Sequence, residues 1–224
     1  MREVVIDTET TGLDPAQGHR VVEVGCLELV NGVPSGRSFQ AYVNPERDVP
    51  AEAHAVHGLS AEFLADHPTF AGIAGGLLDF LGDAPLVAHN AEFDLGFLNA
   101  ELALVGLAPL APERAVDTVG LARRRFPGAP ASLDALCRRF GIDLGGRALH
   151  GALKDAELLA RVYLELIGGR QPDLALATIA GAKAVAGPRT DAPARPPRPH
   201  APTPEEEAAH ARFIDRLTRP VWRA

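Results

Sequence analysis

The sequence has few cysteines, a single tryptophan and no long apolar run. Its 224 residues include only 2 Cys, 1 Trp and 1 Met. Cys26 and Cys137 lie far apart and form no CxxC pair, so two buried thiols are expected rather than a redox or zinc site. No stretch approaches the ~18 apolar residues that a membrane-spanning helix needs. Polar residues follow the first apolar segment at once, so no signal peptide is recognised and a cytoplasmic protein without a membrane partner is expected.

Sequence motifs of several enzyme classes are also absent. There is no GxxxxGK[ST] loop, which argues against nucleotide-driven work. There is no GxSxG nucleophile elbow and no Cys/His zinc pattern. Carboxylates and histidines remain as the candidates for chemistry.

Positive charge is scarce in the first three quarters of the chain. The net charge is −7, and residues 1–167 contain 13 Lys+Arg against 23 Asp+Glu. Such an acidic body argues against a broad electrostatic grip on nucleic acid. It does not exclude a nuclease, because bound divalent cations can neutralise carboxylates that are gathered at a site.

The composition changes sharply near Gly168, where the apolar periodicity fades. Seven prolines fall between Pro188 and Pro204, and a segment of this kind cannot bury a core. Helical order is expected to return at Thr203 or Pro204, where three glutamates suit a helix N-terminus. The predicted organisation is a domain over 1–169, a Pro/Ala-rich linker over 170–203 and a terminal segment over 204–224.

The first part alternates predicted strands and helices. Short β-rich or apolar runs predict strands, and apolar spacing of 3.6 residues predicts helices. The predicted strands are Glu3–Asp7, Val21–Val30, Ser38–Val43, Pro85–Ala88 and a short one ending at Val116. The predicted helices are Thr69–Leu81, Glu92–Val105, one capped by Ser132, and Ala152–Ile167. This order predicts an α/β layer fold with a mixed sheet.

Two carboxylates come together at the first predicted strand. Asp7 ends the strand and Glu9 lies two residues on, so an extended backbone points both side chains the same way. Neighbouring carboxylates repel each other unless a cation lies between them, and Mg²⁺ or Mn²⁺ prefers such oxygen ligands. The alternative is a polar strand end that leads into a turn.

Further acids lie at the starts of two predicted helices. Asp94 is in the first turn of its helix, where an acid can simply favour the helix dipole. Asp155 falls in the early turns of the last helix, where small neighbours are expected to leave open space. His150 precedes that helix and is of the residue type that abstracts protons near neutrality. The alternative for the last pair is a capping acid and a loop histidine.

Together, these five residues are the set of side chains that indicates hydrolysis of a phosphodiester. Four carboxylates and one histidine are what hydrolysis assisted by two metal ions requires. They come from three separate segments of the sequence.

The same segments resemble the three exonuclease motifs of the DEDDh superfamily. Asp7-x-Glu9 resembles the first, His89-Asn90-x-x-Phe93-Asp94 the second, and His150-x-Ala152-x-x-Asp155-Ala156 the third. Within the superfamily the chain resembles the epsilon (proofreading) subunits of bacterial DNA polymerase III. The resemblance covers nearly all of Val4 to Gly169 and reaches the terminal Trp222-Arg223-Ala224.

The resemblance implies an RNase H-like fold, with a five-stranded mixed sheet flanked by helices and followed by a flexible C-terminal tail. It implies two divalent cations, Mg²⁺ or Mn²⁺, with Asp7, Glu9 and Asp155 as their direct ligands and as substrate contacts. Asp94 would act through bound water, and His150 would be the general base.

Two further residues resemble family residues near the terminal nucleotide of the substrate. These are Glu52 and His57, which are otherwise an ordinary loop acid and a turn histidine. Arg123-Arg124-Arg125 could touch phosphate, but a solvated helix end is the plainer interpretation.

The resemblance also implies partners for the tail. The DNA 3′ end is the expected substrate, and residues 204–224 hold the polymerase (alpha) subunit in the family. Gln171–Leu176 resembles the QxxLxL peptide that bacterial proteins insert into the sliding clamp, although so short a motif often occurs by chance.

The expected function is therefore proofreading by 3′→5′ hydrolysis of DNA, which releases nucleoside 5′-monophosphates. Two alternatives remain open. One is a free-standing DEDDh nuclease that trims RNA or oligonucleotides, and the other is a noncatalytic scaffold that binds polymerase or clamp. Association with a polymerase would argue against the free-standing nuclease. Exonuclease activity would argue against the noncatalytic scaffold.

Overall fold

The computed structural model describes residues 1–145, 149–168 and 201–216. The chain divides into two compact units, Met1–Leu174 and Ala175–Ala224. Most of the predicted linker at 170–203 lies outside the described residues, and so does the whole Gln171–Leu176 segment.

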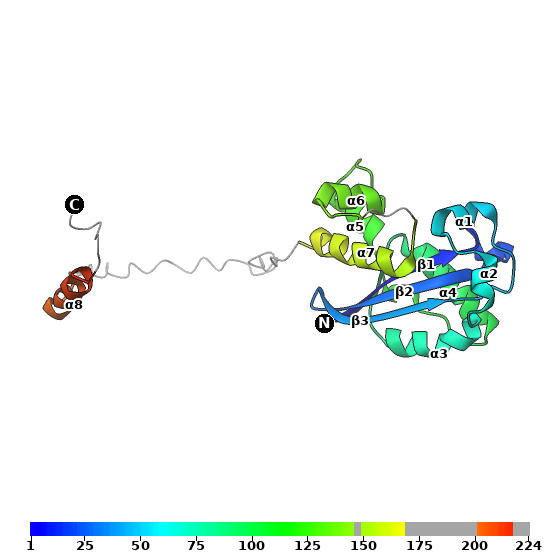
Figure 1. The fold of residues 1–224 in the computed structure, drawn as a ribbon, viewed down its shortest axis with the longest axis horizontal. Coiled ribbons are helices and arrows are strands. Elements are labelled where there is room, and N and C mark those ends of the chain that lie inside the picture. Colours follow the sequence, from blue (N-terminus) through cyan, green and yellow to red (C-terminus); the bar gives the residue numbers. More distant parts are fainter. Residues whose placement is uncertain (146–148, 169–200, 217–224) are drawn as a thin grey trace, which may run out of the picture. The chain divides into compact units, whose positions relative to one another are not determined.

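A five-stranded mixed sheet forms the centre of the first unit, in the order β3-β2-β1-β4-β5 (Figure 1). Strand β2 pairs antiparallel with both β3 and β1, whereas β4 and β5 run parallel to β1. The strands are β1 (Arg2–Thr10), β2 (Val21–Val30), β3 (Val33–Tyr42), β4 (Leu86–Ala88) and β5 (Ala115–Asp117). The predicted five-stranded mixed sheet is confirmed.

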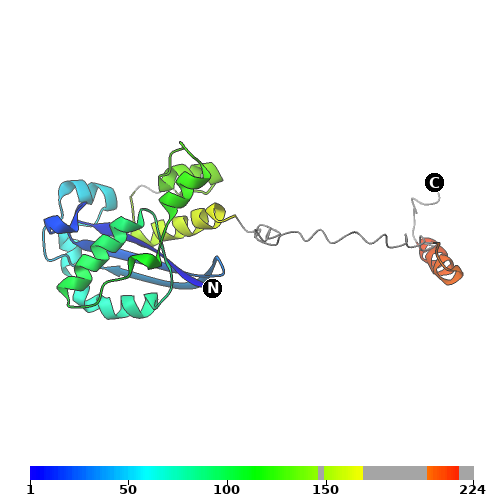
Figure 2. The ribbon, with the colours of Figure 1, turned by 180° about the vertical axis from the view of Figure 1, so that it is seen from behind.

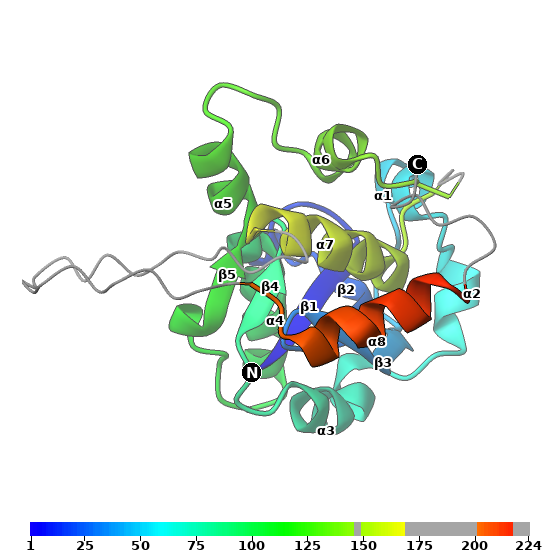
Figure 3. The same ribbon diagram turned by 90° about the vertical axis from the view of Figure 1, so that its left-hand side faces the viewer.

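Helices cover both faces of this sheet (Figures 1 and 3). One face carries α7 (Ala152–Leu166), against which α5 (Thr118–Arg125) and α6 (Leu133–Phe140) pack. The other face carries α3 (Phe70–Leu81) and α4 (Ala91–Leu104). The same two layers are visible from behind (Figure 2). Two short helices, α1 (Ala51–His57) and α2 (Ala61–Ala65), follow β3 and were not predicted.

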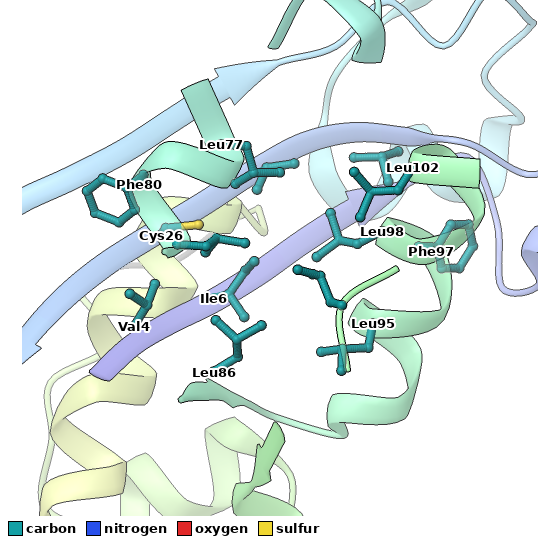
Figure 4. Packing of buried hydrophobic residues seen from close by; sticks show 14 of the residues in the cluster. Val4, Ile6, Cys26, Leu77, Phe80, Leu86, Leu95, Phe97, Leu98 and Leu102 are labelled. Carbon is teal, nitrogen blue, oxygen red and sulfur yellow. The ribbon is translucent and has the colours of Figure 1, made fainter. Parts of the chain in front are cut away.

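The side chains of β1 alternate between two cores. Val4 and Ile6 are fully buried with the residues of α3 and α4, as Figure 4 shows for one close-up of that core. Val5 is fully buried in the second core, with α7. Because alternate strand residues point to opposite faces, Asp7 and Glu9 continue the face of Val5 toward α7.

Strand β1 is longer than the sequence predicts. Its pairing with β2 continues to a register shift between Glu9 and Thr10, so Asp7 lies within the strand and not at its end. The backbone hydrogen bonds of the neighbouring strand hold this polar stretch extended, which a propensity argument underestimates because tertiary pairing overrides it.

The loop between β1 and β2 is anchored from α4. Glu101, which is 2% exposed, accepts hydrogen bonds from Arg20 Nε and Nη2, both at 2.8 Å, and from Val21 N at 3.0 Å. Thr11 and Arg20 also exchange hydrogen bonds across the base of the loop. The loop that follows the first motif is therefore fixed to the core at its far end.

The second unit contains the helix α8 (Pro204–Ile214). Thr203 caps it and forms a reciprocal capping box with Glu206, so the predicted start of this helix is confirmed. Phe213 on this helix is 57% exposed. Among the helices in the described parts of the chain, none has the length and apolar character of a membrane span.

Candidate active site

The first motif lies on the face of the sheet that α7 covers. In the register of β1 and β2, Asp7 pairs with Gly25 and Glu9 pairs with Glu23. Glu9 is only 8% exposed, so its carboxylate lies in the interior of the first unit. The alternation of an extended strand thus delivers both acids to one side, as the sequence indicated.

The third motif lies at the start of α7. Asp155 is in the first turn of the helix and is 3% exposed, so it is buried and not surrounded by the open space expected from its small neighbours. The small residues instead allow the helix to approach the sheet closely. The side chain of His150 is 49% exposed, and its Nδ1 lies 3.2 Å from Asp155 Oδ2. The imidazole of His150 therefore contacts Asp155 through Nδ1, while about half of the side chain is exposed to solvent.

Donor atoms of these two motifs converge. One ligand atom each from Glu9, His150 and Asp155 lies within 4.8 Å of the others. Asp7 lies two residues before Glu9 on the same face, and it lines a cavity together with His150 and Asp155. Oxygen-rich donor sets of this kind suit hard divalent cations, so these residues fit the metal that the motifs imply.

The second motif supplies a buried acid from the opposite side of the strand. Asp94, on α4, is 3% exposed and accepts a hydrogen bond of 2.8 Å from Thr8 Oγ1. Burial raises the pKa of Asp94 to about 7, although hydrogen bonds with Thr8 act in the opposite direction. A cation nearby would favour the ionised carboxylate.

A cavity of about 590 Å³ opens beside Glu9. Its walls are the loop after β1, the helix α1 and Phe93. Glu52 and His57 both line it, so the two residues that were predicted near the terminal nucleotide share one cavity. A volume of this size accommodates small organic ligands. Glu52 lies on α1 and not in a loop.

The environment of His57 favours an uncharged ring. His57 is 5% exposed, and its Nδ1 accepts a hydrogen bond of 3.0 Å from Leu59 N. Burial lowers the pKa of His57, and the neighbouring charge of His54 lowers it further. A neutral imidazole facing a cavity offers recognition without a fixed charge.

A second, more polar cavity has a volume of about 860 Å³. It is lined by Asp7, His150 and Asp155, together with Arg123 and the start of α6. The acids of the site therefore border two cavities, Glu9 the first and Asp7 and Asp155 the second.

Two supporting residues escaped the sequence analysis. Thr8, which lies between the two acids of the first motif, donates a hydrogen bond to Asp94. Asp117 accepts hydrogen bonds from Asn90 N and from the first turn of α5, which joins the second motif to β5. An acid directly before a helix is a capping signal and could have identified Asp117. Thr8 has no such signal, because its partner is 86 residues away.

Comparisons with known proteins identify the family of the chain. The model of the Exonuclease family matches residues 4–163. The DNA polymerase III subunit epsilon of Rickettsia felis is 56% identical over 174 residues, which cover 76% of each chain. The chain belongs to the exonuclease family, among the epsilon subunits of DNA polymerase III. As a member of that family it is a 3′-5′ exonuclease, and DEDDh exonucleases use divalent metal ions.

Other relatives of this epsilon-family exonuclease support the same assignment. The epsilon subunit of Escherichia coli K12 is 45% identical over 178 residues, which cover 75% of this chain and 72% of the relative. A structure of exonuclease X in complex with 5′ overhanging duplex DNA matches with a TM-score of 0.58 and 26% identity, over 73% of this chain and 90% of that one. The nuclease domain of 3′hExo, a DEDDh family member bound to rAMP, matches with a TM-score of 0.64 and 22% identity, over 74% and 91%. The predicted RNase H-like fold is thereby confirmed.

Proposed function

We propose that this chain proofreads DNA by hydrolysing the 3′-terminal phosphodiester, with release of nucleoside 5′-monophosphates. The observation that carries the proposal is the convergence of donor atoms from Glu9, His150 and Asp155 within 4.8 Å, at a site that borders two cavities. Replacement of the converging acids by Ala tests it, and loss of exonuclease activity is the expected result.

The residues divide the work as follows. Asp7, Glu9 and Asp155 would hold two divalent cations, Mg²⁺ or Mn²⁺, and Asp94 would assist from the Thr8 side. The bound cations supply the positive charge that activates water and stabilises the leaving 3′-oxygen. His150 accepts a proton from the attacking water at its exposed imidazole.

The substrate fits the cavity beside Glu9. Glu52 and His57 line this cavity, and we propose that they contact the terminal nucleotide. Asp7, Glu9 and Asp155, which would hold the cations, would also be substrate contacts. An unpaired 3′ terminus reaches such a cavity at lower cost than a paired one, because it has already lost its stacking and pairing. Preference for mispaired ends follows from that difference.

The proofreading role requires a polymerase, and the tail is the proposed contact. We propose the organisation predicted from the sequence: a nuclease domain over 1–169, a linker over 170–203 and a polymerase-binding segment over 204–224. Phe213 on α8 is 57% exposed, so this apolar side chain is accessible to a partner surface. A tether raises the local concentration of the nuclease near its partner without fixing its orientation.

Replacement of Phe213 and Trp222 by Ala should abolish association with the polymerase alpha subunit. Trp222 lies outside the described residues and enters as the predicted anchor. Co-elution of the full-length double mutant with purified polymerase measures the effect, and activity on single-stranded DNA should stay near that of the native chain. A double mutant that still co-elutes at native affinity, while a variant of the nuclease domain does not, would place the polymerase contact on the nuclease domain instead of the tail.

The sliding clamp is a second proposed partner, through Gln171–Leu176. The double variant Gln171→Ala/Leu174→Ala should bind the clamp at least about tenfold more weakly. This corresponds to a loss of ~1.4 kcal/mol of binding free energy. Surface plasmon resonance against immobilised clamp measures this, while the rate on short DNA should not change. If clamp affinity is unaltered, the segment is plain linker.

A further inference from the structure

The first turn of α7 is held by a residue that no motif contains. The first N–H groups of any helix lack partners within it. Gly151, which precedes this helix, has no side chain with which to accept them. Instead, Ala152 N donates a hydrogen bond of 3.1 Å to Glu23 Oε2, which comes from a position 129 residues away in the sequence.

Glu23 is rigidly placed on β2. It is 2% exposed, and its other oxygen, Oε1, accepts a hydrogen bond of 2.8 Å from Gln40 Nε2 on the neighbouring strand β3. Both carboxylate oxygens are therefore engaged by fixed partners. Since β2 and β3 are paired along their length, the position of Glu23 Oε2 is set by the sheet and not by the helix.

A steric contact fixes the same turn of helix. Gly25 lies two residues beyond Glu23 and faces the same side of the sheet. A Cβ atom at Gly25 would lie 2.2 Å from Leu153 N and 2.3 Å from Ala152 C. The backbone of α7 thus rests directly on β2, with the hydrogen bond from Ala152 beside it.

This turn of α7 carries the two functional side chains of the third motif. His150 lies two residues before Ala152, and Asp155 N donates to Gly151 O at 2.9 Å within the turn itself. Displacement of the turn along the sheet would move Asp155 and His150 together, relative to Glu9 on β1.

The negative charge of Glu23 has a cost at this place. Glu23 and Glu9 are directly opposite partners of the β1–β2 ladder, and like charges in such pairs are destabilising. The hydrogen bond from Ala152 N to Glu23 Oε2 offsets the repulsion between Glu23 and Glu9.

We propose that Glu23 is a positioning residue for the exonuclease reaction, which sets the placement of Asp155 and His150 by holding Ala152 N–H. The inference rests on the proposed functions of Asp155 and His150. It assigns the effect to the reach of one oxygen atom and not to the charge of the side chain.

Two conservative variants of the full chain separate reach from charge. Glu23→Asp keeps the charge but draws the oxygens back by about 1.5 Å, the length of one carbon–carbon bond. Glu23→Gln keeps the reach, because its amide oxygen can accept from Ala152 N while the side chain of Gln40 turns to present its own oxygen. Glu28→Asp is the matched control, since Glu28 is another buried acid of β2 that binds Arg2, Ser35 and Arg37 instead of α7.

The expected result is a fall in kcat of about 10- to 100-fold for Glu23→Asp, with KM for single-stranded DNA within about twofold of native. Mn²⁺ titrated into the full chain without DNA should bind about tenfold more weakly to Glu23→Asp. Hydrogen exchange of the Ala152 amide should accelerate in the same variant. Glu23→Gln should stay within about threefold of native in all three measurements, and Glu28→Asp should keep native kcat and Mn²⁺ affinity.

Opposite outcomes would overturn the proposal. If Glu23→Gln loses as much as Glu23→Asp, the charge acts and not the reach. If Glu23→Asp loses protection at Ala152 but keeps native kcat and Mn²⁺ affinity, the contact is structural only. If Glu23→Asp does not fold, Gln40→Leu, which frees one side of Glu23, should lower Mn²⁺ affinity, and native affinity would refute the idea. Active Asp155→Ala or His150→Gln would refute the proposed function instead, whereas amide exchange at Ala152 reports on Glu23 alone.

Discussion

Replacement of Asp7, Glu9 or Asp155 by Ala is expected to lower the exonuclease rate by at least about 1,000-fold, the equivalent of ~4 kcal/mol of transition-state stabilisation. Each change removes an oxygen donor from a site in which the atoms of Glu9, His150 and Asp155 lie within 4.8 Å of one another. Release of nucleotides from a labelled single-stranded DNA, with Mg²⁺ or Mn²⁺ in excess, measures the loss. A chelator should abolish native activity, and either cation should restore it.

The fold should survive these replacements. Glu9 and Asp155 are buried near other acids, so loss of one carboxylate relieves repulsion in the metal-free protein. Thermal unfolding followed by circular dichroism should therefore give a melting temperature at or above that of the native chain. Asp79→Ala, on the exposed side of α3, is the matched control and should keep full activity. Native activity in the presence of chelator would refute the role of the cations.

Replacement of His150 by Gln should lower kcat by about 100-fold or more, because general-base catalysis contributes ~10²- to 10⁴-fold. His150 Nδ1 lies 3.2 Å from Asp155 Oδ2 while half of its side chain is exposed, so the imidazole can meet both the acid and a solvent water. Glutamine retains size and polarity but does not accept the proton. Single-turnover kinetics measures the chemical step, and a separate Mn²⁺ titration should show that the variant still binds metal.

The pH dependence adds a second readout for His150. A base must be neutral to accept a proton, so the native rate should fall on the acid side, and His150→Gln should lose part of this dependence. A residual dependence is expected from Asp94, because burial raises its pKa while a nearby cation would oppose that shift. His67→Gln, which changes a histidine packed against Tyr42 and Phe63, is the control and should keep the native profile. A variant of His150 with the native rate and profile would show that another group is the base.

Much of the fold was predictable because its signals are local. Apolar spacing identified α3, α4 and α7 to within one residue at either end, and Val21–Val30 was predicted with the bounds that the structure gives. The sequence underestimated β1, whose polar end stays extended through its pairing with β2, and it gave no sign of α1, a helix of seven residues. A helix this short gains its stability from packing and not from propensity.

The sequence likewise predicted some features of the site, and the tertiary structure determined others. The sequence by itself determined which residue types are present and which lie on one strand face, so Asp7, Glu9, Asp94, His150 and Asp155 could all be named from their motifs. Only the tertiary structure decided that Asp155 is buried, that Thr8 holds Asp94, and that Glu23 reaches Ala152. These contacts join residues 86 and 129 positions apart, and no local pattern carries that information because the distance between them is set by the packing of α4 and α7 on the sheet. The sequence thus identifies the acids, and the close packing of α7 on β2 determines their positions.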